Sequence, residues 1–138
     1  MSLEENKVLV RRFVEVIQCR HDLDKLDEFF SSDFIDYGGM ANPPTFEGAE
    51  VFFAAFLNAF PDHHFTIHQQ LAEGDKVMTH KTCQATHMGP FGPFPATGKP
   101  VTFHVIDIFS IANGRMTGHW LVTDLFAAML QITAAAAA

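Results

Sequence analysis

Cysteines, basic residues and long hydrophobic runs are all scarce in this sequence of 138 residues. The two cysteines, Cys19 and Cys83, have neither metal-type nor CxxC spacing, which argues against a disulfide framework or a zinc site. Only 9 basic residues stand against 16 acidic ones, so nucleic acid and anionic membranes are not expected partners. No apolar run approaches the ~20 residues of a membrane span, and the charged N-terminus lacks a signal peptide's apolar core. We therefore expect a cytoplasmic protein.

Tyrosine and tryptophan are also rare, with one of each, whereas phenylalanine occurs 15 times. A protein interior built mainly from phenylalanine has few polar groups. It forms either a wide apolar pocket or simply a Phe-rich core. A chain of this length folds as one domain and can enclose a small cavity. We assign residues 1–133 to a single domain and give no role to the alanine run at 134–138.

Apolar residues at helical spacing dominate the first 60 residues. Ser2 and Glu5 form a capping-box pattern at the start of the first amphipathic stretch. Helices are expected at Ser2–Gln18, His21–Phe30 and Glu47–Phe60, with a short strand at Asp33–Tyr37. From His63 onward the period changes to two, which predicts strands.

Two hairpins and a loop make up most of the second half. The first hairpin turns at Glu73–Asp75 and returns from Lys76 to His87, the Gly/Pro-rich loop covers Met88–Pro100, and the second hairpin covers Val101–Asp124. A short helix from Leu125 to Ile132 follows. The order α-α-β-α-β-β-β-β is typical of an α+β fold with helices on one face of a curved, mainly antiparallel sheet.

The turn of the second hairpin sets the relative position of two titratable residues. A three-residue loop, Ala112–Gly114, with glycine in the left-handed region, would place Asp107 opposite His119 on one face. A two-residue Asn-Gly turn would instead place Asp107 opposite Trp120. We favour the three-residue loop.

Three segments resemble a known family over essentially the whole chain. They are RRFVEVIQCRHDLDKLDEFFSSDFIDY, GDKVMTHKTCQATHMGPFGPFPATGKPVTF and IDIFSIANGRMTGHW. The sequence is similar to the SnoaL-like polyketide cyclases, which share a cone-shaped α+β barrel with nuclear transport factor 2 and ketosteroid isomerase. The resemblance implies three N-terminal helices on the sheet. It also implies a cofactor-independent cyclase or isomerase that removes a proton α to a carbonyl in a small hydrophobic ketone or ester.

Individual positions depart from the family pattern. SnoaL-type cyclases commonly follow the His-Trp pair with a catalytic Asp, and that position here is Leu121. Asp107 matches the oxyanion-donating Asp of ketosteroid isomerases, and Asp36 roughly matches their general base. The helix-one Tyr of those enzymes is Phe13 here. The alternatives are therefore a non-catalytic module that binds an apolar ligand, favoured by Leu121, and a structural dimerisation domain if the pocket is filled.

Asp107 and His119 are the candidate proton-handling pair. A carboxylate on an apolar face must find a partner or take up a proton, and histidine titrates closest to neutral pH. If the long hairpin is centred near Phe94, Lys81 lies opposite Asp107, which would keep Asp107 ionised and favour a base over an oxyanion donor. The same row of charges is also consistent with a purely structural ion-pair network.

The expected ligand site is an apolar pocket between the helices and the inner face of the sheet. Its predicted contacts are Phe13, Ile17, Phe34, Asp36, Tyr37, Phe56, Lys81, His87, Val105 and Leu121. The remaining histidines show no convergent ligand spacing, so no metal is expected. The outer sheet face carries Ile106, Ile108, Trp120 and Val122, too much contiguous apolar surface for a monomer. This face predicts a homodimer, with a heteromeric partner as the alternative.

Overall fold

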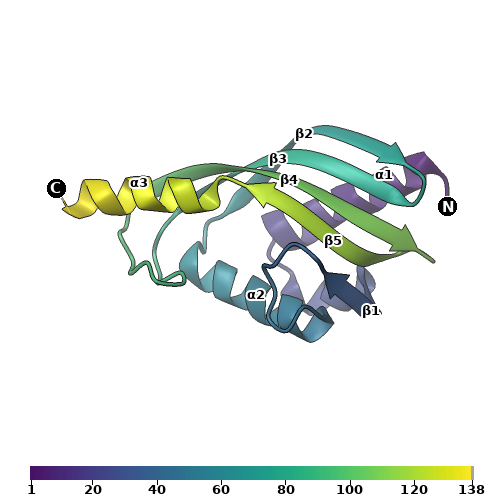
Figure 1. Ribbon diagram of the computed structural model, residues 1–138, viewed down its shortest axis with the longest axis horizontal. Coiled ribbons are helices and arrows are strands. Elements are labelled where there is room, and N and C mark those ends of the chain that lie inside the picture. Colours follow the sequence, from purple (N-terminus) through teal and green to yellow (C-terminus); the bar gives the residue numbers. More distant parts are fainter. Residues whose placement is uncertain (138) are drawn as a thin grey trace.

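The computed structural model describes residues 1–137 and contains helices packed on a five-stranded mixed sheet (Figure 1). The elements are α1 (Leu3–Phe13), the π-helix η1 (Val14–Cys19), the 3₁₀-helix η2 (Leu23–Glu28), β1 (Phe30–Asp36), α2 (Phe46–Ala59), β2 (His64–Glu73), β3 (Lys76–Thr86), β4 (Pro100–Ala112), β5 (Arg115–Thr123) and α3 (Leu125–Ala137). Helix α3 is longer than the expected Leu125–Ile132 segment, because it continues through the alanine run to Ala137, and position 138 lies outside the described residues. None of the helices described here has the length and apolar content needed to cross a membrane.

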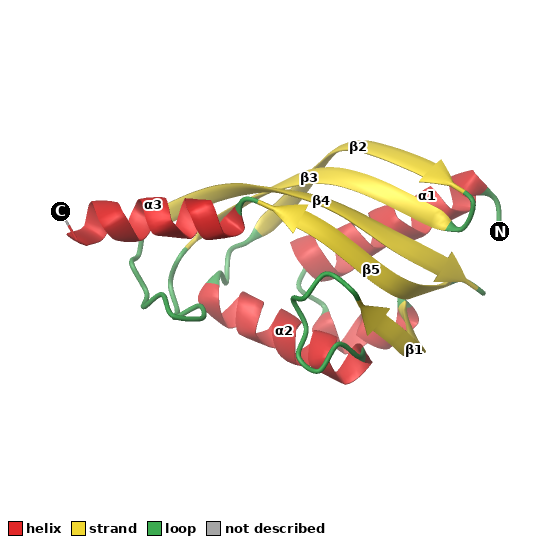
Figure 2. Cartoon of the chain, viewed as in Figure 1, coloured by secondary structure: helices red, strands yellow, loops and turns green. Residues whose placement is uncertain are grey.

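The sheet confirms the expected α+β architecture. Its strand order is β1-β5-β4-β3-β2, with β1 parallel to β5 and every other pair antiparallel. The sheet curves over α1 and α2 on one side (Figure 2). Its edge strands β1 and β2 are not paired with each other, so the cone is an open sheet and not a closed barrel.

Side-chain caps and an aromatic core position the two main helices. The capping box is present at α1, where Ser2 Oγ accepts from Glu5 N at 3.0 Å. Phe13, at the end of α1, is fully buried and makes edge-to-face contacts with Phe30, Phe53 and Phe109 at centroid distances of 5.6, 5.9 and 5.4 Å. Helix α1, helix α2 and the sheet are thereby packed around one ring.

The first helix is not α-helical throughout, which corrects the expected Ser2–Gln18 helix. From Val14 to Cys19 it is a π-helix, in which residues five apart, rather than four apart, align. Gln18 therefore lies on the same face as Phe13. With α-helical spacing, Ile17 would have been on that face. The second expected helix is also shorter and tighter, a 3₁₀-helix from Leu23 to Glu28.

The hairpin of β4 and β5 differs from the expected one in two ways, and together these leave the same residues on each face of the sheet. Asn113 and Gly114 both have positive φ, 52° and 73°, and form a two-residue turn instead of the three-residue loop. A bulge then leaves Thr117 as an extra residue on β5. Because the two changes together restore the parity of the strands, Asp107 and His119 still share a face, with Asp107 directly opposite Leu121.

Candidate active site

A cavity of about 80 Å³ lies between the helices and the inner face of the sheet. A cavity needs about 10–15 Å³ of such volume to hold one water. This cavity therefore holds several waters or a ligand the size of a single ring. Most of its lining is apolar: Phe13, Phe30, Phe34, Met40, Ala41, Ala49, Phe52, Phe53, Phe56, Phe65, Phe103, Val105, Phe109, Leu121 and Leu125. The Phe-rich interior thus contains a pocket and is not simply a filled core.

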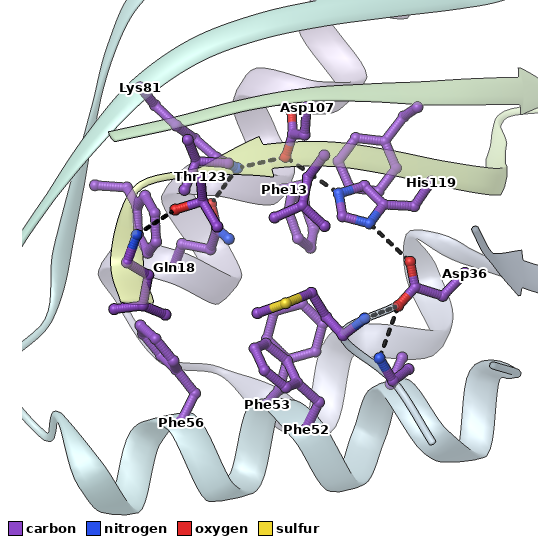
Figure 3. Close-up of a pocket in the computed structure, with 18 of the residues that line it drawn as sticks. Phe13, Gln18, Asp36, Phe52, Phe53, Phe56, Lys81, Asp107, His119 and Thr123 are labelled. Atoms are coloured by element: carbon purple, nitrogen blue, oxygen red, sulfur yellow. Dashed lines mark hydrogen bonds and ion pairs between the residues drawn. The ribbon is translucent and has the colours of Figure 1, made fainter. Parts of the chain in front are cut away.

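A chain of five polar side chains crosses one side of this cavity (Figure 3). Lys81 pairs with Val105 across β3 and β4, and not with Asp107 as expected, but its side chain reaches Asp107 diagonally. Lys81 Nζ donates to Gln18 Oε1 at 2.8 Å and lies 3.0 Å from Asp107 Oδ2. The same Asp107 oxygen lies 3.4 Å from His119 Nε2, and His119 Nδ1 lies 3.1 Å from Asp36 Oδ1. Elements that are distant in sequence, η1, β1, β3, β4 and β5, each supply one member.

Asp107 is 2% exposed and has one occupied and one free oxygen. Burial would raise the pKa of its carboxyl, but the positive charge of Lys81 and the hydrogen bond from His119 outweigh burial and lower the pKa. Oδ2 makes both polar contacts, whereas Oδ1 is buried without a hydrogen-bond partner among the described residues. The site therefore presents an ionised carboxylate with one unused acceptor.

His119 bridges two carboxylates. Both ring nitrogens face carboxylate oxygens, an arrangement that favours the imidazolium, which donates from both nitrogens. Burial alone would lower the pKa of His119, but the hydrogen bonds to Asp107 and Asp36 outweigh burial and raise the pKa. The Nε2 contact at 3.4 Å is longer than usual hydrogen bonds, so an oxygen atom placed in the cavity would compete for that proton.

Asp36 is held by the loop that follows β1. Its carboxylate accepts from the backbone N–H groups of Gly38, Met40 and Ala41 at 3.0, 3.1 and 2.7 Å. Burial opposes ionisation, yet the hydrogen bond with His119 and these amides lower the pKa of Asp36. Its backbone pairs with that of His119 in the parallel ladder between β1 and β5. Asp36 therefore orients His119 from the side opposite Asp107.

Most residues expected in the pocket line the cavity, and three lie elsewhere. Phe13, Phe34, Asp36, Phe56, Lys81, Val105, Asp107, His119 and Leu121 line it. Ile17 is buried in the core, away from the cavity, because of the π-helix. Tyr37 points to the opposite face from Asp36, is 59% exposed and stacks on Trp120 at 4.8 Å. His87 is fully buried at the end of β3, with Nδ1 3.1 Å from Thr97 Oγ1.

Sequence reasoning missed three polar lining residues, Gln18, His63 and Thr123. An ammonium only donates, so the Gln18 oxygen must face Lys81 and the Gln18 amide nitrogen is turned elsewhere. That Nε2 has no acceptor among the described residues and is available to a ligand oxygen. Only recognition of the π-helix could have indicated Gln18. Among residues 1–137, no group of three or more His, Cys, Asp or Glu is arranged to hold a metal ion.

The fold and the site together define a small α+β protein of the nuclear transport factor 2-like class, with a mostly apolar cavity and a polar cluster on one wall. The chain belongs to the SnoaL-like polyketide cyclase family, whose sequence pattern matches residues 7–132. Among proteins of curated function, none matches the chain significantly.

Solved structures of similar proteins share the whole fold. TsrD from Streptomyces laurentii has a TM-score of 0.86 at 23% identity, covering 97% of this chain and 98% of its own. A protein from Jannaschia sp. CCS1, provisionally assigned as a SnoaL-like polyketide cyclase, has a TM-score of 0.84 at 26% identity, with coverage of 95% and 93%. AclR from Streptomyces galilaeus, provisionally assigned as a hydroxylase, has a TM-score of 0.83 at 25% identity, with coverage of 96% and 98%.

Proposed function

We propose that this protein is a cofactor-independent enzyme of cyclase or isomerase type, which removes a proton α to a carbonyl in a small hydrophobic ketone or ester. The observation that carries the proposal is Oδ1 of Asp107, a buried oxygen of an ionised carboxylate that has no hydrogen-bond partner among the described residues, on the wall of a mostly apolar cavity. A desolvated carboxylate with one unused acceptor is suited to act as a general base. Family membership supports the class of chemistry.

Asp107 and His119 have complementary roles in the proposed step. The α C–H bond breaks, its proton moves to Asp107 Oδ1, and the carbonyl oxygen takes the proton of His119 Nε2, giving an enol. In a cyclisation, the enol carbon then bonds to a second carbonyl carbon of the same molecule. The new alkoxide takes the proton from Asp107, and the enol O–H returns its proton to His119. Gln18 Nε2 is a further donor for either substrate oxygen.

Leu121 stands where SnoaL-type cyclases commonly carry a catalytic Asp, which favours the alternative of a non-catalytic module for an apolar ligand. Asp107 pairs directly with Leu121 across β4 and β5. Its carboxylate therefore lies one strand away from the usual position and reaches the same cavity. This adjacency supports Asp107 as the base in place of the missing carboxylate.

We also propose that the protein is a homodimer that pairs through the outer sheet face. Ile106 and Val122 are 44% and 76% exposed on that face, and Met78 is 39% exposed beside them. Exposed apolar groups on adjacent strands form the kind of continuous patch that soluble proteins usually bury against a partner.

Deuterium exchange at the α-carbon distinguishes catalysis from ligand binding. Acetophenone, phenylacetone and 1-indanone, which approach the size of the cavity, are incubated with the protein in D₂O and followed by NMR. We expect Asp107→Asn to lower the exchange rate by ~10²-fold or more, the usual contribution of a positioned base. Asp33→Asn changes an exposed carboxylate on β1 and should leave the rate unchanged. His119→Gln tests the acid independently. Equal exchange in all proteins, with ligand affinity preserved, would favour the binding module.

A further inference from the structure

His63 also lines the cavity and is not a member of the chain of five polar side chains. It lies directly before β2 and is 5% exposed. Its ring packs against Phe56 at a centroid distance of 4.8 Å. Figure 3 places Phe56 at the opposite end of the cavity from Asp36 and His119. His63 therefore adds a polar group at the end of the cavity away from Asp36 and His119.

The hydrogen bond of His63 Nδ1 fixes the tautomer of the ring. Nδ1 lies 2.8 Å from the carbonyl oxygen of Phe60, and since a carbonyl only accepts, the proton is on Nδ1. Nε2 is then an acceptor, and it has no hydrogen-bond partner among the described residues. Burial lowers the pKa of His63 to about 4, so the ring is neutral at ordinary pH. His63 thus offers the cavity an acceptor that carries no charge.

His21 holds the His63 ring in place. The two rings lie 4.1 Å apart, and His21 Nε2 is 2.7 Å from the backbone carbonyl oxygen of His63. His21 adopts a φ of 63°, a left-handed conformation that is uncommon for a residue other than glycine. Such conformations persist where the surrounding structure determines them. With His21 on one side and Phe56 on the other, His63 is a fixed acceptor and not a mobile side chain.

We propose that His63 is a specificity-determining residue whose Nε2 accepts a hydrogen bond from a hydroxyl group at the far end of the ligand. The substrate class is accordingly a hydroxylated aryl ketone or ester, with its carbonyl at the Asp107 and His119 end, an orientation that rests on the proposed function. A ligand without the hydroxyl would cover this acceptor without pairing it, which is unfavourable. The apolar middle of the cavity fits one aromatic ring between the two ends.

Three ketones that differ at one position test this inference by calorimetry. They are 4-hydroxyacetophenone, 4-methoxyacetophenone, which keeps the oxygen but has no donor, and acetophenone. We expect the wild type to bind the hydroxyl compound about tenfold more tightly than the other two, as one added hydrogen bond allows. His63→Leu should remove this preference. His64→Leu makes the same change at the neighbouring exposed residue and should retain it.

Two results would overturn the inference: no preference for the hydroxyl compound in the wild type, or an unchanged preference in His63→Leu. Failure of the wild type to bind any of the three ketones at millimolar concentration would also contradict it. If His63→Leu does not fold, the ¹⁵N shift of His63 Nε2 in the wild type should still move with the hydroxyl ligand and stay unchanged with the methoxy one. These are binding measurements and are independent of catalysis. A binding preference for the hydroxyl ketone without α-deuterium exchange would reject only the proposed enzyme activity. Exchange without that preference would reject only the role of His63.

Discussion

At the scale of single residues, the contact between Lys81 and Asp107 decides the charge state of the site. Both side chains are almost completely buried, at 1% and 2% exposure. Burying two charges costs several kcal/mol per ion, and their attraction offsets this only with good geometry and further hydrogen bonds. Lys81 has a second acceptor in Gln18 and lies 5.1 Å from the centroid of the Phe65 ring. These contacts offset part of the cost of burial, so the ion pair need not add net stability.

Replacing Lys81 alone should be costly, and replacing both partners should not. We expect Lys81→Met to lower the free energy of unfolding by about 3–5 kcal/mol, because it leaves Asp107 buried without its cation. The double variant Lys81→Met/Asp107→Leu should recover most of that loss. Lys25→Met, at an exposed position, should stay within about 0.5 kcal/mol of the wild type. Urea unfolding measures all three, and a double variant no more stable than Lys81→Met would contradict this reading of the pair.

At the scale of elements, the loop between β1 and α2 positions the carboxylate that orients His119. It brings the amides of Met40 and Ala41 onto Asp36 and then passes over the first turn of α2 at Gly48. A Cβ at Gly48 would overlap the carbonyl oxygen of Pro43. Glycine is therefore required there by the close approach of the loop, although alanine is the better helix former.

Gly48→Ala should destabilise the protein by about 1–3 kcal/mol, the usual cost of overpacking, whereas glycine to alanine in an open helix interior stabilises by about 0.5–1 kcal/mol. Ala55→Gly, on the exposed side of α2, measures the helix-propensity contribution by itself and should cost about 0.5–1 kcal/mol. Thermal unfolding gives both values. A Gly48→Ala protein as stable as the wild type would show that the loop can move away and does not hold Asp36 rigidly.

The elements also show how far the sequence can predict this site. Asp107 and His119 were predicted on one face from a three-residue loop that is absent, and they share that face only because the bulge offsets the two-residue turn. The turn and the bulge at Thr117 were not predictable, because a bulge is set by packing across strands and not by local periodicity. Local periodicity does not reveal the π-helix either. We therefore expected Ile17 at the cavity, where the structure has Gln18.

At the scale of the whole molecule, the two faces of the sheet are unequal. Helices α1 and α2 cover the concave face and enclose the cavity (Figure 1). On the other face, Tyr37 stacks on Trp120, and the nearby side chains of Ile106 and Val122 are exposed. A partner on this face would leave the cavity unobstructed, so the proposed dimer and the proposed chemistry are compatible.

Sedimentation velocity tests the dimer. We expect the wild type to be a dimer at micromolar concentration and Val122→Glu to be a monomer, because a charge would be buried in the apolar contact. Val51→Glu makes the same change on α2, where Val51 is 64% exposed, and should leave the dimer intact. A monomeric wild type, or an unchanged dimer with Val122→Glu, would assign the outer face to another role.

The pH dependence of α-deuterium exchange, in the wild type and in His119→Gln, tests the central claim most directly. The pKa of Asp107 lies below its ordinary value of 3.8, and that of His119 lies above its ordinary value of 6.5. Carboxylate base and imidazolium acid therefore coexist between these values. We expect a constant exchange rate from about pH 4 to 6.5 that falls as the pH rises through the raised pKa of His119. This alkaline decline should disappear in His119→Gln. A wild-type rate that instead increases with pH above 6.5 would identify neutral His119 as the base and contradict the role given to Asp107.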